Sequence, residues 1–158
     1  MKILMVCLGN ICRSPLAEGI LRKKLNEAGL KHITVDSAGT SGHHAGENPD
    51  PRSIRNAKKN GVDISGIVSR KFSVEDFDRF DRIYVMDHSN YNNVLSLARN
   101  KADEQKVELL LNVLHPGKNK AVPDPWYGGD EGFQEVFELV DKACDALVEQ
   151  LKKENSHE

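Results

Sequence analysis

The protein has 158 residues, a formal net charge of −2 and 39% hydrophobic residues, which suits one folded domain and excludes a disordered chain. The slightly acidic balance argues against a binder of nucleic acid or of anionic membrane surfaces, and the longest apolar run, Ile3–Leu8, is too short to cross a membrane. Three cysteines are too few for a disulfide framework, so the composition predicts a reducing, cytoplasmic setting.

The first third of the chain alternates between strand and helix signals. A continuous apolar run, Lys2–Cys7, predicts a strand that is buried on both faces of a parallel sheet. Ser14, followed by proline, predicts the N-cap of a helix whose apolar residues recur at helical spacing until Gly29. Ile33–Val35 predicts a second strand, and residues 37–49, rich in Gly, Ser and His, predict a loop.

The rest of the chain continues this alternation. Asp50, followed by proline, predicts the start of a second helix, which Asn60-Gly61 ends. Further along, the sequence predicts a short helix beginning at Ser73 and containing Phe77 and Phe80, a strand at Ile83–Met86, a helix at Ser89–Ala98, a strand at Val107–Leu111, a loop at 115–129, and a final helix from about Glu131 to Leu151.

Strands that alternate with helices predict an α/β fold, with a parallel sheet and helices on both of its faces. Residues 1–151 are expected to form one domain, and the polar tail Lys152–Glu158 is expected to fray. Ligands of such sheets bind beyond the carboxyl ends of the strands. The loop between the first strand and the first helix is therefore the first candidate for a functional site.

That loop reads Cys7-Leu8-Gly9-Asn10-Ile11-Cys12-Arg13-Ser14, a C-x5-R-S pattern. A loop that wraps back onto a helix N-terminus points its backbone N–H groups inward and binds phosphate. Gly9 and Asn10 most readily adopt the positive φ that such wrapping needs, and Arg13 offers a planar fork of donors for two phosphate oxygens. The same surroundings favour the thiolate form of Cys7, to which Ser14 can donate while it caps the helix. Together these residues predict a nucleophilic phosphate site.

Asp124 is the candidate proton donor and base that phosphoryl transfer to sulfur requires. Prolines on both sides stiffen its loop, and the neighbouring Trp126 and Tyr127 predict an aromatic pocket wall. Asp50 also precedes a proline, but a helix N-cap explains it better.

The segments VCLGNICRS and DPWYGG together resemble the low molecular weight protein tyrosine phosphatases, and the resemblance covers essentially residues 1–152. It implies a flavodoxin-like fold with a four-stranded parallel sheet, and a two-step mechanism that uses neither a metal nor another cofactor. It also implies that Cys7 is the nucleophile that forms a phosphocysteine, that Arg13 clamps the phosphoryl group, and that Asp124 acts first as acid and then as base.

The resemblance implies supporting roles as well. Asn10 holds the loop in a left-handed turn, Ser14 assists the thiolate, and Ser37 supports Asn10 from the second strand. Cys12 matches a loop cysteine that forms a reversible disulfide with the nucleophile under peroxide, and a packing role for it stays equally open. The predicted phosphate-binding and supporting residues are thus Leu8, Gly9, Asn10, Ile11, Cys12, Ser14 and Ser37.

Three positions depart from the family pattern. Ile67 stands where a histidine often supports the asparagine network. His43, with His44 beside it, stands where the pocket wall is often aromatic. Trp126 and Tyr127 replace a pair of tyrosines, which removes one phosphorylation site. The predicted wall of the substrate pocket is therefore His43, Trp126 and Tyr127.

Other activities of the same fold stay open. Arsenate reductases resemble this loop but relay oxidation through further cysteines, whereas Cys144 lies in an apolar helical stripe and is expected in the core. A protein-arginine phosphatase that shares this fold resembles sequences that have threonine where this chain has Ile11. The larger side chain of Ile11 favours an aryl phosphate ester over a guanidinium phosphate. Asp124 argues against a non-catalytic phosphoprotein-binding module. The cysteines and histidines lack the paired spacing of a zinc site.

The expected partner is a phosphotyrosine protein, because an aryl phosphate reaches a deep, narrow loop more easily than phosphoserine does. The resemblance to bacterial members adds a tyrosine kinase of exopolysaccharide assembly as a candidate substrate. Nucleic acid and membrane are not expected partners. The aromatic pair Trp126 and Tyr127 leaves the oligomeric state open between a monomer and weak self-association.

Overall fold

The fold is built on one sheet whose four strands lie in the order β2-β1-β3-β4, with each neighbouring pair parallel. The structure is a computed structural model that describes residues 1–125 and 129–156. The strands are β1 (Lys2–Cys7), β2 (Thr34–Gly39), β3 (Arg82–Val85) and β4 (Val107–Leu109). The predicted parallel α/β sheet is confirmed.

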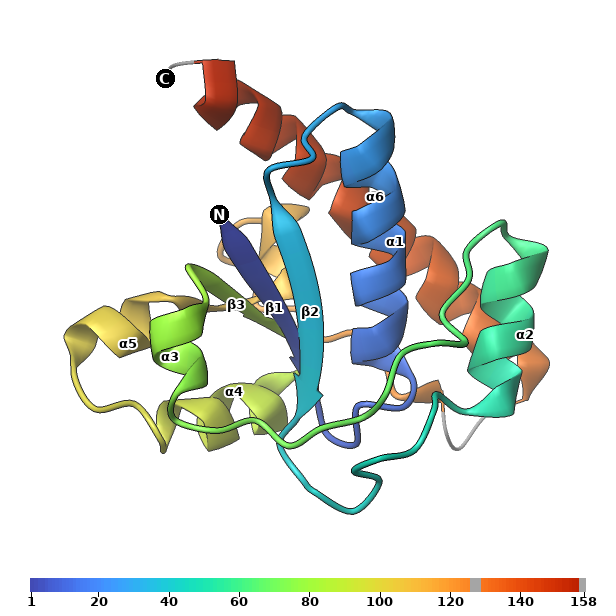
Figure 1. Cartoon of the computed structure of the whole chain (residues 1–158), viewed down its shortest axis with the longest axis horizontal. Coiled ribbons are helices and arrows are strands. Elements are labelled where there is room, and N and C mark those ends of the chain that lie inside the picture. The colour runs from blue at the N-terminus through green and yellow to red at the C-terminus, as the bar shows by residue number, and fades with distance from the viewer. Residues whose placement is uncertain (126–128, 157–158) are drawn as a thin grey trace.

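Helices cover both faces of the sheet (Figure 1). One face carries α1 (Arg13–Glu27), α2 (Pro51–Lys59) and α6 (Asp130–Ser156), and the other carries α3 (Asp76–Arg79), α4 (His88–Leu95) and α5 (Lys101–Gln105). The N-terminus and the last turn of α6 lie on the side of the amino ends of the strands, away from the loop that follows β1. No helix in the described ranges is long and apolar enough to cross a membrane.

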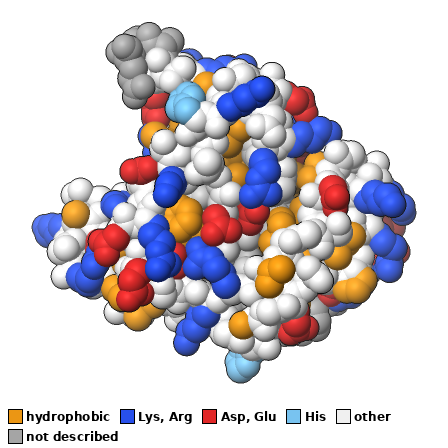
Figure 2. All heavy atoms as spheres, viewed as in Figure 1, with side chains coloured by type: hydrophobic (Ala, Val, Ile, Leu, Met, Phe, Trp, Pro, Cys, Tyr) orange, Lys and Arg blue, Asp and Glu red, His pale blue; other side chains and the backbone are white. Residues whose placement is uncertain are grey.

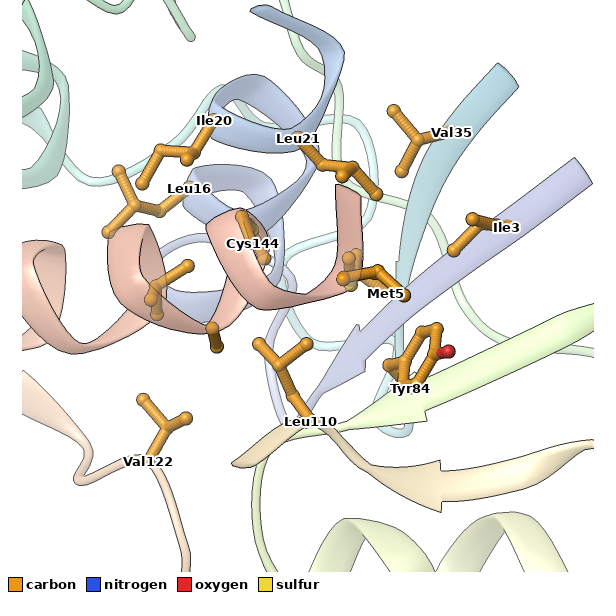
Figure 3. Close-up of a cluster of buried hydrophobic side chains, with 14 of the residues drawn as sticks. Ile3, Met5, Leu16, Ile20, Leu21, Val35, Tyr84, Leu110, Val122 and Cys144 are labelled. Carbon is orange, nitrogen blue, oxygen red and sulfur yellow. The ribbon is translucent and has the colours of Figure 1, made fainter. Parts of the chain in front are cut away.

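The side chains of β1 alternate between two separate cores, as a strand buried on both faces requires. Ile3 and Met5 belong to the core beneath α1 and α6, and Leu4 and Val6 belong to the core beneath α3 and α4. Figure 3 shows the first of these cores, with Cys144 of α6 facing the sheet. Cys144 is fully buried, which confirms its predicted place in the core.

Several predicted element boundaries were wrong. The second strand continues to Gly39, so that Ser37 lies within the sheet and not in the predicted loop. The fourth strand ends at Leu109, because the chain turns there into a 3-10 helix, η1 (Leu110–Val113), whose first two residues are buried. The last helix ends at Ser156 and not at Leu151, because the polar residues beyond the apolar stripe are also good helix formers.

The region after β3 contains one helix more than predicted. The helix predicted at Ser89–Ala98 spans His88–Leu95, and α5 follows at Lys101–Gln105. The side chain of Asn100 accepts a hydrogen bond from the backbone of Asp103, which caps α5. Before β3, the short helix predicted from Ser73 spans only the four residues of α3.

Candidate active site

The loop between β1 and α1 wraps around the sulfur of Cys7. Asn10 has a φ of 56°, the left-handed conformation that asparagine tolerates, whereas Gly9 does not have a positive φ. Gly9 is instead constrained by space, since a Cβ there would lie 3.2 Å from Cδ2 of His44. The prediction that both residues need positive φ is thus correct for Asn10 only.

Three polar groups converge near Cys7. Its Sγ lies 3.0 Å from Oγ of Ser14 and 3.3 Å from the backbone nitrogen of Asn10, which donates to it. Nδ2 of Asn10 donates to the same Ser14 oxygen at 2.8 Å. Because Ser14 accepts from Asn10, its own hydroxyl proton is available for the sulfur, and the alternative acceptor, the carbonyl of Ala38, is farther away at 3.4 Å.

Ser14 does not cap the helix, contrary to the prediction. The helix begins one residue earlier, at Arg13, and its N-cap position is Cys12, which makes no side-chain capping bond. The hydroxyl of Ser14 is fully engaged with Cys7 and Asn10 instead.

Arg13 connects the loop with two other segments. It is 3% exposed, and its Nη1 donates to Oδ2 of Asp87 at 2.7 Å and to the carbonyl of Val122 at 2.9 Å. Its Nη2 lies 3.8 Å from Oδ2 of Asp124, so the predicted arginine and the predicted acid meet at one site.

Asp87 was missed by the sequence analysis. One of its oxygens binds Arg13, and the other accepts from the backbone of Asn90 at 2.8 Å and caps α4. A signal was present, because Asp87 directly follows a predicted strand, at the edge of the sheet where ligands bind.

Asp124 lies at the rim of the site, with its side chain 34% exposed. Its loop is tied to the sheet by Val122, whose N–H donates to the carbonyl of Met86 at 2.8 Å. Trp126 and Tyr127, the predicted aromatic wall, lie outside the described residues.

These side chains surround a cavity of about 220 Å³. Its lining is Cys7, Leu8, Gly9, Ile11, Cys12, Arg13, His44 and Asp124. A larger hollow, about 480 Å³, lies between β3, β4 and α6, but its described lining contains no cysteine or serine. The smaller cavity is lined by both the candidate nucleophile, Cys7, and the candidate phosphate-binding arginine, Arg13.

The histidine at the wall is His44 and not the predicted His43. His44 stands beside Gly9, and its Nδ1 pairs with Oε2 of Glu47 at 2.9 Å, while His43 is exposed. A shift of one residue in an irregular loop changes which side chain faces the pocket, and no periodic pattern fixes it.

Ser37 does not support Asn10, which corrects a second predicted contact. Its hydroxyl donates to Oε1 of Glu18 at 2.6 Å. The side-chain oxygen of Asn10 instead accepts from the backbone nitrogen of Arg70 at 3.1 Å. Ile67, at the position of the family histidine, is partly buried against the core under α1 and α6.

Cys12 lies in a small apolar cluster with Ile11 and Phe133. Burial raises the pKa of its thiol, and the nearby acidic groups Asp50, Cys7 and Asp124 raise it further. Cys7 and Cys12 are both free thiols here. Among the described residues, no group of three His, Cys, Asp or Glu side chains is arranged to hold a metal ion.

Known proteins resemble the whole chain. The family described as low molecular weight phosphotyrosine protein phosphatase matches residues 2–157. A low molecular weight phosphotyrosine protein phosphatase of Schizosaccharomyces pombe is 43% identical over 143 residues, which are 89% of this chain and 90% of that protein. The crystal structure of a protein tyrosine phosphatase from Entamoeba histolytica superimposes with a TM-score of 0.91 at 36% identity, covering 98% of this chain and 99% of that one. A drosophila arginine phosphatase superimposes with a TM-score of 0.89 at 30% identity, covering 96% and 98%.

Proposed function

The chain belongs to the low molecular weight phosphotyrosine protein phosphatase family, and from this membership we propose that it hydrolyses phosphotyrosine in proteins through a phosphocysteine intermediate. One observation carries the proposal. The sulfur of Cys7 lies within 3.0 Å of the Ser14 hydroxyl and 3.3 Å of the Asn10 N–H, in a cavity that Arg13 and Asp124 also line.

In the first step, the Cys7 thiolate attacks phosphorus and the bond from phosphorus to the tyrosine oxygen breaks. Protonated Asp124 at the rim gives its proton to the departing phenolate oxygen. Arg13 and the loop N–H groups hold the three equatorial oxygens, whose charge is spread in the transition state. The buried fork of Arg13 supports this role, because Asp87 and Val122 already fix its orientation.

In the second step, water attacks the phosphocysteine and the sulfur–phosphorus bond breaks. Asp124, now a carboxylate, takes a proton from the water, and inorganic phosphate leaves with the electron pair of the S–P bond returning to sulfur. The hydrogen bonds from Asn10 and Ser14 stabilise the thiolate that departs, which makes it a better leaving group.

The proposed substrate is a phosphotyrosine protein, with a bacterial tyrosine kinase as one candidate. Cys7 is buried, with 3% of its surface exposed, and the exposed Leu8 lines the same cavity. A long aryl phosphate reaches such a sulfur, whereas a short phosphoserine side chain does not. We propose a reducing compartment such as the cytoplasm, because three cysteines are too few for a disulfide framework.

Phosphoarginine is the second candidate substrate, because one structural neighbour is an arginine phosphatase. Ile11 lines the cavity here, and its branched apolar side chain favours contact with a flat aromatic ring over a charged guanidinium. We therefore expect aryl phosphates to be the better substrates.

The test compares a phosphotyrosine peptide with phosphoarginine, and arsenate reduction is measured alongside. Wild type is expected to prefer the phosphotyrosine peptide, Cys7→Ser to lose turnover, and Asp124→Asn to lose much more on a poor leaving group than on an activated aryl phosphate. Full activity in Cys7→Ser would falsify the covalent route. Ile11→Thr is the control for specificity, and an unchanged ratio between the two substrates would remove Ile11 from the argument.

A further inference from the structure

Two consecutive residues from outside the loop hold Gly9 and Asn10. The backbone N–H of Arg70 donates to Oδ1 of Asn10 at 3.1 Å, and the hydroxyl of Ser69 donates to the carbonyl of Gly9 at 3.0 Å. Both contacts join positions that are 60 residues apart. The conformation of the loop therefore depends on where this distant segment lies.

The segment around Arg70 runs alongside the end of β2 in space, but it does not form a strand. The N–H of Gly39 donates to the carbonyl of Arg70 at 2.8 Å, and the N–H of Phe72 donates to the carbonyl of Gly39 at 2.7 Å. Gly39 and Lys71 form an isolated parallel bridge. A ladder this short at the edge of a sheet fixes the position of the segment only weakly, so side-chain contacts must hold it in place.

The guanidinium of Arg70 holds the segment in place through two ion pairs. Its Nη1 donates to Oδ2 of Asp76 at 3.1 Å, and its Nη2 donates to Oδ2 of Asp36 at 3.2 Å. Asp76 is 0% exposed and also accepts from the N–H of Ser73 at 2.9 Å. Nη1 of Arg79 also lies 3.5 Å from the other oxygen of Asp76, so Arg70 is the nearer of two cations on this buried carboxylate, and its loss would leave Asp76 with only the longer contact. Acidic and basic side chains lie side by side over this face of the molecule (Figure 2).

Asn10 links the ion pairs of Arg70 to the reacting sulfur. Its N–H donates to Sγ of Cys7, and its Nδ2 donates to Oγ of Ser14, which itself lies 3.0 Å from the sulfur. Both donors belong to Asn10, so a displacement of this residue changes both contacts near the sulfur.

We propose that Arg70 is a positioning residue for the nucleophile: its ion pairs with Asp76 and Asp36 place the backbone N–H that fixes Asn10, and Asn10 fixes the donors around Cys7. This inference rests on the proposed function, since it concerns the same sulfur. It also explains how the loop is supported in a chain with Ile67, whose side chain has no hydrogen-bonding group.

The test uses Arg70→Gln, which removes both ion pairs and keeps the backbone N–H. The matched control is Arg99→Gln, because Arg99 likewise joins two carboxylates, Asp78 and Asp103, in the region of α3 and α5. The rate of iodoacetate alkylation at Cys7 is measured against pH by mass spectrometry. We expect the midpoint of this curve to rise by about one pH unit in Arg70→Gln, with kcat about tenfold lower and KM less affected. Arg99→Gln is expected to leave the curve and kcat unchanged.

Three further variants separate positioning from general damage. Arg70→Lys retains one ion pair and is expected to give an intermediate midpoint. Asp36→Asn, at a half-exposed carboxylate, gives the same shift in milder form if Arg70→Gln does not fold. In the Asn10→Ala background, Arg70→Gln is expected to add no further loss, because residues that act through one another are not additive.

Equal shifts in the Arg70 and Arg99 variants, or additive losses with Asn10→Ala, would overturn the inference. Thermal unfolding of each variant shows that it is folded at the temperature of the assay. The alkylation curve needs no substrate. A wild type without activity on phosphotyrosine would therefore refute the proposed function and leave the result for Arg70 intact.

Discussion

At the scale of single residues, Arg13 joins three segments of the chain with one guanidinium. From the start of α1 it binds Asp87 after β3 and the carbonyl of Val122, and Asp124 lies 3.8 Å away. A planar fork that is already oriented loses little side-chain freedom when it binds an anion. In the proposed mechanism, the arginine is thus already oriented for a phosphoryl group before substrate binds.

The three cysteines are expected to differ in reactivity because their surroundings differ. Burial raises the pKa of the Cys12 and Cys144 thiols, so both remain protonated, and hence unreactive, at neutral pH. We expect iodoacetamide at pH 7 to label Cys7 in the native protein and the other two only after denaturation, as mass spectrometry of the peptides will show. Native Cys7→Ser serves as the control, and rapid labelling of its Cys12 would contradict the argument from burial.

At the scale of elements, the end of β2 contacts the phosphate-binding loop directly. Gly39 pairs with Cys7 in the sheet register, and the N–H of Ser41 donates to the carbonyl of Leu8 at 2.9 Å. The strand therefore continues past its predicted end because it binds the loop as well as β1.

Gly39→Ala is expected to damage the loop directly. A Cβ at this position would lie 2.8 Å from the carbonyl oxygen of Leu8 and 3.1 Å from the nitrogen of Asn10, and both are backbone atoms that cannot turn away. We expect a loss of about 1–3 kcal/mol in the free energy of unfolding and at least about a tenfold fall in kcat. Gly66→Ala is the control, since no atom lies within 4 Å of its Cβ. Equal effects of the two substitutions would exclude the steric explanation.

The start of α2 is tied to the same loop. Asp50 caps the helix by accepting from the N–H of Arg52 at 2.8 Å, and its own N–H donates to the carbonyl of Ile11 at 2.8 Å. Burial of the Asp50 carboxyl opposes ionisation, but the hydrogen bonds from Arg52 prevail and lower its pKa.

This lowered pKa predicts how stability depends on pH. A carboxyl with a depressed folded-state pKa contributes stability above its unfolded value of about 3.9, and the contribution is lost as the pH falls through the folded value. We expect Asp50→Asn, which retains a capping oxygen, to be less stable than wild type at pH 7 and to converge with it at low pH in urea titrations. Asp50→Ala is expected to lose about 1 kcal/mol more, because the cap is gone. A gap between wild type and Asp50→Asn that does not narrow on acidification would contradict this assignment.

At the scale of the whole molecule, α6 holds the C-terminal part of the chain against one face of the sheet. Its apolar side packs with α1 over the sheet, and Lys24 of α1 binds Asp141 and Asp145 of α6 at 3.0 and 2.6 Å. The same pair borders the site, because α1 begins with Arg13 and Ser14, and Phe133 of α6 packs against Ile11 and Cys12 of the loop.

Leu147→Ala tests this packing. Leu147 is 0% exposed, and its truncation is expected to cost about 2–5 kcal/mol of unfolding free energy, through the lost burial and the cavity left behind. Leu97→Ala makes the same chemical change at a side chain that is 45% exposed, and we expect it to change stability by less than about 0.5 kcal/mol. Chemical denaturation measures both, and similar costs would mean that the core under α6 is not tightly packed.

The strand, the loop and the helix of residues 2–27 are predictable from the sequence because their signals are local. The apolar run, the C-x5-R-S pattern and the apolar spacing of the helix all act within a few neighbouring positions. These residues are consecutive in the sequence, so local backbone geometry places Cys7, Asn10, Arg13 and Ser14 in one loop, and distant contacts hold that loop in shape. Asp124 was recognised through its own short motif, and the structure brings it near Arg13.

Only the tertiary structure decided which distant residues support that loop. The contacts of Asp87 with Arg13 and of Arg70 with Asn10 join positions 74 and 60 residues apart, and neither residue carries a local pattern that announces its partner. The same holds for His44 at the pocket wall and for Ser37, whose hydroxyl goes to Glu18. The sequence by itself determined the reactive loop, since consecutive residues build it, and the tertiary packing determined its supports, since they come from segments far away in the sequence.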